Sequence, residues 1–198
     1  MKPQKRETLL AYSVKEHGTF LATRVKGADA RRALEEQLTA AARVPLLTID
    51  FSGVEAMTNS FVDEFLGKFY LQLAAGDVSA DGVQLVGLDE ETREGVAVCL
   101  ARRKQVALDG DTHELLGDAS ILAGTYAEAR RLADFRATEL AEALGISLPN
   151  ANNRLKRLVE AGALYRERSA GPERGGKEFT YRLPPAGDGR GDAKRAKK

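Results

Sequence analysis

Apolar residues in the first half of the chain follow two alternating spacings, one typical of strands and one typical of helices. Short apolar runs predict strands at residues 8–14, 20–25, 44–51, 83–88 and 105–108. Apolar residues at helical spacing predict helices over residues 28–42, 60–75 and 90–103. We expect the first two strands to form a hairpin around His17 and Gly18, and the third strand to be buried on both faces. The pattern predicts an α/β domain of four or five strands and three helices.

The second half carries a different pattern, which predicts a helix-turn-helix between residues 137 and 161. Gly145 ends the first helix as a residue able to adopt positive φ, Ser147 caps the second, and Pro149 lies in its first turn. The apolar residues of the second helix repeat at helical spacing and should face inward: Leu148, Ala151, Leu155, Leu158 and Val159. A further helix over residues 119–133 completes a predicted three-helix unit.

After Gly162 the chain returns to a strand-like pattern. Residues 163–168 and 178–183 predict two strands, and the polar, basic loop between them is rich in Gly and Pro. Two strands around such a loop form a wing. The run RLKRLVEAGALYR also resembles the recognition-helix end and first wing strand of many bacterial winged-helix regulators. The second half is therefore predicted to be a winged helix of the α+β class.

A polar, Gly-containing segment at residues 109–118 (DGDTHELLGD) indicates a domain boundary. We divide the chain into an α/β domain at residues 1–112, a winged-helix domain at residues 113–185 and a basic tail at residues 186–198. The tail is rich in Gly, Asp and Lys, so we expect it to be disordered.

One face of the predicted helix at residues 147–161 carries side chains that suit double-stranded DNA. In a winged helix this element lies in the major groove with its N-terminal half on base edges. Its three asparagine amides can pair with adenine, and its basic side chains suit phosphates. Basic residues of the wing would meet the DNA backbone or the minor groove. The predicted DNA-contacting residues are Ser147, Pro149, Asn150, Asn152, Asn153, Arg154, Lys156, Arg157, Arg168, Arg174 and Lys177.

The net charge of +1 hides an asymmetry that agrees with this surface. Residues 1–129 hold 14 Lys and Arg against 20 Asp and Glu, whereas residues 130–198 hold 16 against 9. The last third is therefore basic (+7) and the rest acidic (−6). The four cations of the final five residues account for only part of the excess. A basic third joined to an acidic body favours a polyanionic partner.

Composition excludes several other classes. The single cysteine, Cys99, rules out an internal disulfide and fits a reducing cytoplasm, and with two histidines a zinc site is not expected. No apolar run approaches a membrane span, and the first residues lack the apolar core of a signal peptide. We expect a cytoplasmic protein with no metal or other cofactor.

The section from Asp50 to Phe61 (DFSGVEAMTNSF) reads as a strand end, a glycine turn and a polar helix cap. It resembles the corresponding section of STAS domains, the fold of bacterial anti-sigma-factor antagonists. It resembles more closely a STAS-like family of unknown function, whose members carry an Asp-Phe-x-x-Val run followed by Ser-Phe and an acidic pair. The other residues that fit this family are Thr23, Arg24, Gly27, Arg31, Asp63 and Glu64. The resemblance covers roughly residues 8–105 and implies a mixed α/β sheet domain that senses a signal or binds a partner.

In antagonists of this fold, a partner kinase phosphorylates a Ser at the start of a helix. The resemblance places Asn59 at that position, between Thr58 and Ser60. Asn cannot accept a phosphate, so Thr58 or Ser60 would have to replace it, at a helix N-terminus where a phosphate is electrostatically favoured. The alternative is that the three residues only cap the helix.

Three functions follow from these features. The first is a non-enzymatic transcriptional regulator that binds DNA through its winged helix, as a homodimer because such regulators usually bind two half-sites. The second is a partner-switching adaptor that binds a kinase or ATPase and uses its winged helix only to dock proteins. The third is an enzyme that uses Asp50, Glu55, Asp63 and Glu64. Against it, the sequence shows no nearby histidine, no nucleophile motif and no phosphate-binding glycine loop.

Overall fold

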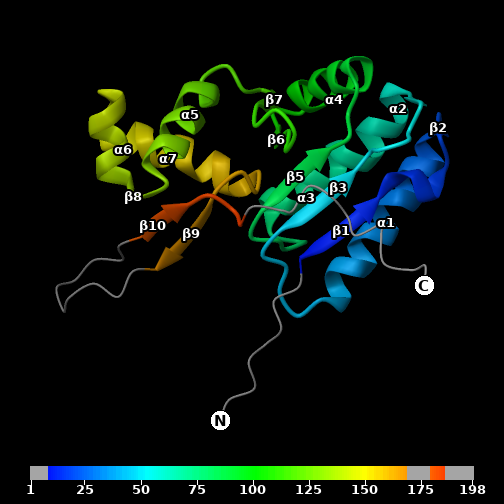
Figure 1. Cartoon of the computed structure of the whole chain (residues 1–198), viewed down its shortest axis with the longest axis horizontal. Helices are drawn as coiled ribbons and strands as arrows, with labels where there is room; N and C mark the ends of the chain where they lie inside the picture. Colours follow the sequence, from blue (N-terminus) through cyan, green and yellow to red (C-terminus); the bar gives the residue numbers. More distant parts are fainter. Residues whose placement is uncertain (1–8, 169–178, 186–198) are drawn as a thin grey trace, which may run out of the picture.

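A computed structural model describes residues 9–168 and 179–185 of the chain. Its two hydrophobic cores correspond to the two lobes of Figure 1, and the hairpin of β6 (Val106–Leu108) and β7 (Leu115–Gly117) lies between the lobes. The predicted fold class, an α/β domain followed by a winged helix, is confirmed. Among the described residues, no helix is both long and apolar enough to cross a lipid bilayer.

The first domain is built on three parallel strands in the order β1-β3-β5, namely β1 (Leu10–Ser13), β3 (Leu47–Asp50) and β5 (Val83–Val86). On β3 and β5 buried and half-buried side chains alternate. One face of the sheet is therefore fully covered, and the prediction that residues 44–51 are buried on both faces is wrong for the strand itself. Apolar residues just before β3, such as Val44 and Leu46, account for the continuous apolar run, because they are buried outside the strand.

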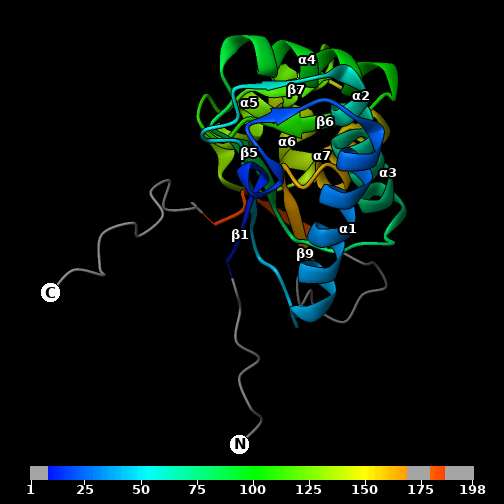
Figure 2. The same cartoon turned by 90° about the vertical axis from the view of Figure 1, so that its right-hand side faces the viewer.

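The helices of this domain lie on one side of the sheet, as Figure 2 shows for α1 and α3. They are α1 (Arg24–Ala40), α2 (Asn59–Val62), η2 (Asp63–Gly67), α3 (Lys68–Ala75) and α4 (Glu90–Arg102). The predicted helix at residues 60–75 runs through α2, η2 and α3, with η2 wound as a π-helix. Gly27 permits α1 to approach this helix, because a Cβ there would lie 2.8 Å from the carbonyl oxygen of Phe61.

The predicted N-terminal hairpin is wrong. β1 pairs in parallel with β3, while β2 (Phe20–Leu21) pairs in parallel with the unpredicted β4 (Ala56–Met57). A 3₁₀ turn, η1 (Val14–His17), lies between β1 and β2. The second predicted strand ends early because Thr23 caps α1, its Oγ1 accepting a hydrogen bond from the backbone N–H of Lys26 at 3.2 Å. Local alternation predicted strands correctly, but their partners lie far away in sequence.

The second domain has three helices, α5 (Leu122–Leu132), α6 (Ala137–Leu144) and α7 (Leu148–Glu160). Its antiparallel sheet has the order β8-β10-β9, with β8 (Asp134–Arg136), β9 (Tyr165–Arg168) and β10 (Phe179–Arg182). The sequence predicted the helices and both wing strands but not β8, which is only three residues long. Phe135 of β8 stacks on Tyr181 of β10, and both rings are part of the hydrophobic core of this domain.

Strand β6 belongs to both cores. The side chains of Val106 and Leu108 join the core of the winged helix, while Ala107 joins the core of the first domain. This alternation is the period-2 pattern of a strand that lies between two apolar environments. The polar segment at residues 109–118, where the sequence indicated a boundary, contains β7 and so packs against α4.

Candidate nucleic-acid interface

Helix α7 begins and ends where local chemistry dictates. Gly145 adopts a left-handed conformation (φ +62°) after α6, as predicted, and so turns the chain toward α7. Ser147 occupies the N-cap with extended backbone and Pro149 lies in the first turn. All three residues are exposed. The start of α7 is thus presented to solvent.

The inward face of α7 fixes which side chains point outward. Ala151, Leu155 and Leu158 are fully buried, and Val159 is half-buried against the same core. The expectation that Leu148 also faces inward is wrong, because it is 41% exposed. It lies at the first position of the helix, beyond the reach of the core, and lines a hollow beside the wing sheet.

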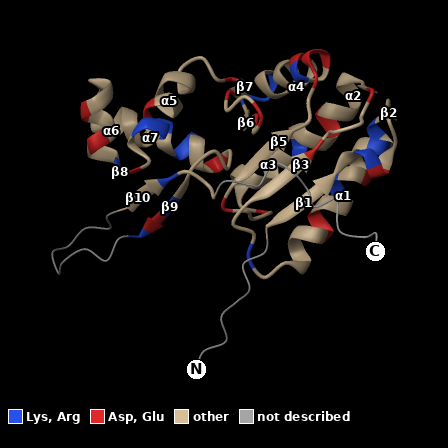
Figure 3. Ribbon diagram, in the orientation of Figure 1, with Lys and Arg blue, Asp and Glu red and all other residues tan. Residues whose placement is uncertain are grey.

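The outward face presents Asn150, Asn152, Asn153 and Lys156, all of them exposed. The Lys156 side chain is 70% exposed and lies 3.6 Å from the Glu160 carboxylate one turn on. Figure 3 shows the basic segments of α7 in the lobe opposite the acidic start of α4. An exposed row of amides followed by a cation is the arrangement that base edges and phosphates require.

Arg154 has an internal role. Its Nε donates to Asn150 Oδ1 at 3.0 Å and its Nη1 to the hydroxyl of Thr125 at 3.2 Å. Thr125 belongs to α5 and is fully buried. The guanidinium therefore fixes the rotamer of Asn150 and links α7 to α5.

Arg157 also has an intramolecular partner. Its Nη2 donates to the carboxylate of Asp118 at 2.8 Å and to the Asp118 carbonyl at 3.3 Å. Asp118 follows β7, outside the helix-turn-helix. The sequence could not indicate this pair, because 39 residues separate its members.

The wing is described only in part. Arg168 is exposed at the end of β9, and Arg166 stacks on the ring of Phe179 at 4.8 Å. Arg182 donates to Asp134 and Glu167, which ties the three strands together. Arg174 and Lys177 lie outside the described residues.

Two residues beside the predicted interface were not singled out from the sequence. Arg136 and Thr138, at the start of α6, line a hollow of about 190 Å³ together with Leu148 and Asn152. This hollow opens between the start of α7 and the wing sheet. The sequence feature that could have indicated this hollow was the predicted start of α6, because the hollow lies between the starts of α6 and α7.

Thr58, Asn59 and Ser60, which the resemblance indicated as the phosphorylation segment, lie at the start of α2. The hydroxyl of Thr58 donates to the Ala22 carbonyl at 2.8 Å and accepts from the Phe61 N–H at 3.3 Å, so it caps the helix. Asn59 and Ser60 are exposed, and the Asn59 carbonyl accepts a weak hydrogen bond from Cys99. The capping function is thus present at Thr58, while Ser60 presents its side chain to solvent.

Of the four acidic residues considered for catalysis, Asp63 and Glu64 are engaged in ion pairs, Asp50 in a turn, and Glu55 is exposed. Asp63 accepts from Arg103 at 2.7 and 3.0 Å and from Arg24 at 3.1 Å, which holds the pKa of its carboxyl below the usual range. A hydrogen bond from Lys68 likewise lowers the pKa of Glu64. Asp50 accepts from the backbone N–H of Ser52. Among the described residues, no group of three or more His, Cys, Asp or Glu could hold a metal ion.

These features define a two-domain protein in which an α/β domain with one covered sheet face precedes a winged helix. Residues 29–80 match the family model of a STAS-like domain of unknown function, and residues 120–175 match the model of the MarR family. The chain therefore joins a STAS-like domain to a MarR-family winged helix, in that order, which confirms the family resemblance of the first domain. A search of curated proteins and a search of solved structures gave no match. The MarR family consists of DNA-binding regulators, so the match supports a transcriptional regulator rather than an enzyme.

Proposed function

We propose that this protein is a transcriptional regulator that reads double-stranded DNA with α7, while its STAS-like domain receives the signal. The observation that carries this function is the outward face of α7, where Asn152, Asn153 and Lys156 project from a helix whose other face is locked in a core. A protein-docking face should carry aromatic or apolar anchors at its centre, and this face carries amides.

Within the interface, the residues take different roles. Asn152 and Asn153 contact base edges, and Asn150 joins them in the orientation that Arg154 imposes. Lys156, Arg168 and the basic residues of the wing loop contact phosphates, which set the register of the protein on the duplex. Ser147 and Pro149 at the exposed start of α7 approach the backbone. We assign Arg157 to holding α7 in place, because Asp118 engages its guanidinium.

The regulator acts as a homodimer in this proposal. A single winged helix covers one half-site, and MarR-family regulators typically dimerise. Two copies place two α7 helices about one helical turn of DNA apart, roughly 34 Å. An operator with two related half-sites follows from this geometry.

The input lies on the STAS-like domain, at the exposed start of α2. Of the two hydroxyl residues there, Ser60 is the candidate acceptor for a phosphate, because the Thr58 hydroxyl is engaged in the cap. A partner kinase or ATPase would then act on Ser60. Mass spectrometry of the protein from its host would locate the phosphate.

The test of DNA binding compares two charge reversals. Fluorescence anisotropy with a labelled random-sequence duplex at low salt should show binding by the wild type. Lys156→Glu should weaken binding about tenfold or more and lower the salt slope by about one, because one phosphate contact is lost. Lys26→Glu, which makes the same charge change on exposed α1, should bind nearly as the wild type does.

Equal losses in both variants would show that only overall charge matters and would remove α7 as the interface. No binding by the wild type, together with a stable complex with a host protein, would favour the adaptor function. A selection of bound sequences from a random pool then tests base reading. Asn152→Ala and Asn153→Ala should each relax the preference at one position, by roughly 1–3 kcal/mol of discrimination.

A further inference from the structure

Hydrogen bonds link the C-terminal end of α7 to the STAS-like domain at two places, once directly and once through Asp118, in the segment that follows β7. Both places lie away from the amides that face outward. The first contact is at Arg157 and the second is at Gly162, just beyond the end of the helix. The two positions are five residues apart in the sequence. Two separated contacts fix the direction of a helix as well as its position.

The contact at Gly162 is a close approach of two backbones. The carbonyl oxygen of Gly162 accepts a hydrogen bond from the N–H of Val83, the first residue of β5, at 2.9 Å. Gly162 adopts a positive φ of +68°, and a Cβ there would lie 2.8 Å from the nitrogen and Cγ2 of Val83. Only glycine fits this position without displacing β5, which is the edge of the STAS-like sheet nearest to the winged helix.

The contact at Arg157 reaches the first domain indirectly, through Asp118. Asp118, which accepts from Arg157, is held in turn by its own N–H, which donates to the Gln105 carbonyl at 2.9 Å. Gln105 precedes β6, and the hairpin of β6 and β7 packs against α4. Through this route α7 is tied to the helical layer of the STAS-like domain.

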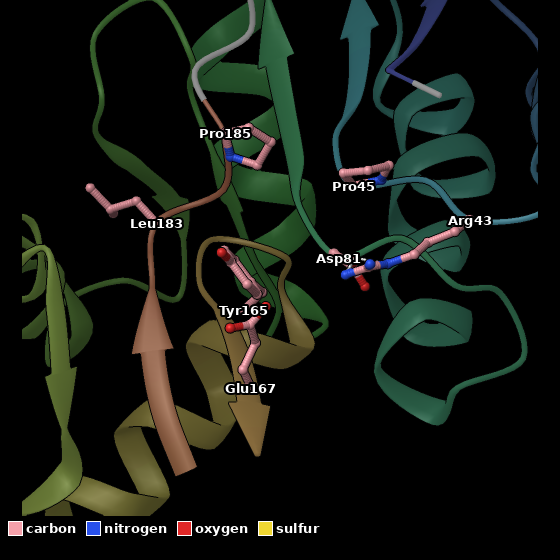
Figure 4. A pocket seen from close by; sticks show the side chains of 7 residues that line it. All are labelled: Arg43, Pro45, Asp81, Tyr165, Glu167, Leu183 and Pro185. Atoms are coloured by element: carbon pink, nitrogen blue, oxygen red, sulfur yellow. Dashed lines mark hydrogen bonds and ion pairs between the residues drawn. The ribbon is translucent and has the colours of Figure 1, made fainter. Parts of the chain in front are cut away.

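The domains also meet where α7 lies against α3 and where Gly82 approaches Pro184, but they leave a space between the wing sheet and the first domain. A cleft of about 270 Å³ lies between them, with Arg43, Pro45 and Asp81 on the first domain and Tyr165 and Glu167 on the wing sheet. Figure 4 shows the side chains of Pro45, Asp81 and Arg43 across from Tyr165 and Glu167. The wing strand β9 therefore stands apart from the STAS-like domain at this point, while the end of α7 is held.

We propose that the STAS-like domain orients the recognition helix through a clamp, in which Val83 holds Gly162 and Asp118 holds Arg157. This inference rests on the proposed DNA-binding function. The clamp residues are positioning residues, which act on DNA only through α7. A change in the STAS-like domain that shifts the start of β5 or the β6–β7 hairpin redirects α7 and so changes the affinity for DNA. The clamp is the route by which a signal on the first domain reaches the second.

The population of clamped molecules sets the apparent affinity. If only a fraction of molecules holds α7 in the binding direction, the apparent Kd rises by the inverse of that fraction. The phosphates contacted in the complex stay the same, so the dependence of binding on salt does not change. Loss of the clamp thus differs from loss of a phosphate contact, which lowers the salt slope.

The first test uses two glycines with matched conformations. Gly76, at the end of α3, also has a positive φ (+82°), but a Cβ there would meet no atom within 4 Å. Gly162→Ala and Gly76→Ala therefore impose similar backbone strain, and only the first displaces β5. We expect Gly162→Ala to bind the random-sequence duplex about fivefold or more weakly, with an unchanged salt slope, and Gly76→Ala to bind as the wild type does. Hydrogen exchange at the Val83 amide should accelerate only in Gly162→Ala.

The second test does not depend on whether Gly162→Ala folds. Asp118→Ala and Asp134→Ala each remove one half-exposed carboxylate that pairs with an Arg, and both increase the positive charge of the protein. Charge alone predicts tighter DNA binding in both. The clamp predicts that Asp118→Ala binds about two- to fivefold more weakly than Asp134→Ala and that Asp118→Glu restores binding.

The outcomes separate the two proposals. If the wild type binds no duplex, the DNA-binding function is wrong. If the wild type binds but Asp118→Ala binds as tightly as Asp134→Ala, and the glycine variants that fold bind alike, the DNA-binding function stands and the clamp is overturned.

Discussion

The two domains differ in the polar side chains that they leave in solvent. In the STAS-like domain, carboxylates pair with cations of other elements, as Asp63 does with Arg103 and Arg24, and Asp109 does with Arg93. On α7, Asn152, Asn153 and Lys156 point into solvent. The winged helix also contains internal pairs, such as Arg157 with Asp118 and Arg182 with Asp134, but its α7 in addition presents a row of exposed amides. A charged residue therefore indicates a ligand only when its internal partners have been identified.

Their cores differ as well. The first core contains a cluster of aromatic rings, with Phe65 in contact with Tyr12, Phe51 and Phe61. The core under α7 is built mainly from aliphatic side chains, such as the fully buried Leu155. An aromatic side chain buries more surface than an aliphatic one, so the ring cluster is where a truncation should cost the first domain most.

The largest expected effect comes from removing the centre of the aromatic cluster. Phe65→Ala should lower the free energy of unfolding by about 3–5 kcal/mol, because it deletes a fully buried ring and leaves a cavity. Urea denaturation followed by circular dichroism measures this loss. Since β6 belongs to both cores, we expect one transition in which both domains unfold together.

The control is Leu71→Ala in the same helical layer. Because Leu71 is 38% exposed, its truncation should lower the free energy of unfolding far less. Two separate transitions in Phe65→Ala would show that the winged helix is stable without its neighbour. That result would contradict the expectation that the two domains unfold together.

A smaller effect tests whether the charges of the first domain act internally. Asp63→Asn should cost about 1–3 kcal/mol, because it removes a carboxylate that accepts three hydrogen bonds from two arginines. Partners lower the pKa of both Asp63 and Glu64 in the folded state. Their stabilisation is therefore complete above the unfolded pKa, about 4, and is lost as the pH falls through the lower folded values.

Urea denaturation of the wild type and of Asp63→Asn between pH 7 and pH 2 measures this dependence. The difference between them should be largest near neutral pH and shrink in acid. A constant difference over the whole range would mean that the Asp63 carboxylate contributes through its shape and not through its charge. DNA binding at pH 7 should be retained, since the partners of Asp63 are Arg24 and Arg103 and not a residue of α7 or of the clamp.

Much of this architecture could be predicted from the sequence, because its elements carry local signals. The spacing of Ala151, Leu155 and Leu158 predicted α7, and Gly145 marked the turn before it. The predictions that failed concern strand pairing between segments far apart in the sequence. Nothing local distinguishes a hairpin at Gly18 from a strand that pairs with distant β3, and β8 becomes a strand only through its pairing with β10.

For the candidate interface, too, the local features could be predicted from the sequence and the long-range contacts could not. Amphipathic periodicity placed the three asparagines on an outward face, and the structure keeps them there. It could not predict that Asp118 engages Arg157, since this pair depends on how the two domains meet. The sequence thus indicates which side chains are available for DNA, and only the fold indicates which of them are already bound.

The smallest expected effect concerns an exception to the rule that the first domain satisfies its own polar groups. The hydroxyl of Tyr70 is buried and has no hydrogen-bond partner among the described residues, whereas the hydroxyl of Tyr12 donates to the Ala30 carbonyl at 2.6 Å and accepts from His17 at 2.7 Å. Tyr12→Phe should therefore destabilise the protein by about 1 kcal/mol, because it leaves the Ala30 carbonyl without this donor. Tyr70→Phe should be neutral or slightly stabilising, because it removes a hydroxyl that was desolvated without compensation. Thermal unfolding of the two variants in parallel measures the contrast, since each loses the same single oxygen. Equal destabilisation by Tyr70→Phe and Tyr12→Phe would show that the Tyr70 hydroxyl has a hydrogen-bond partner within the protein. Tyr70 would then be no exception among the buried polar groups of the STAS-like domain.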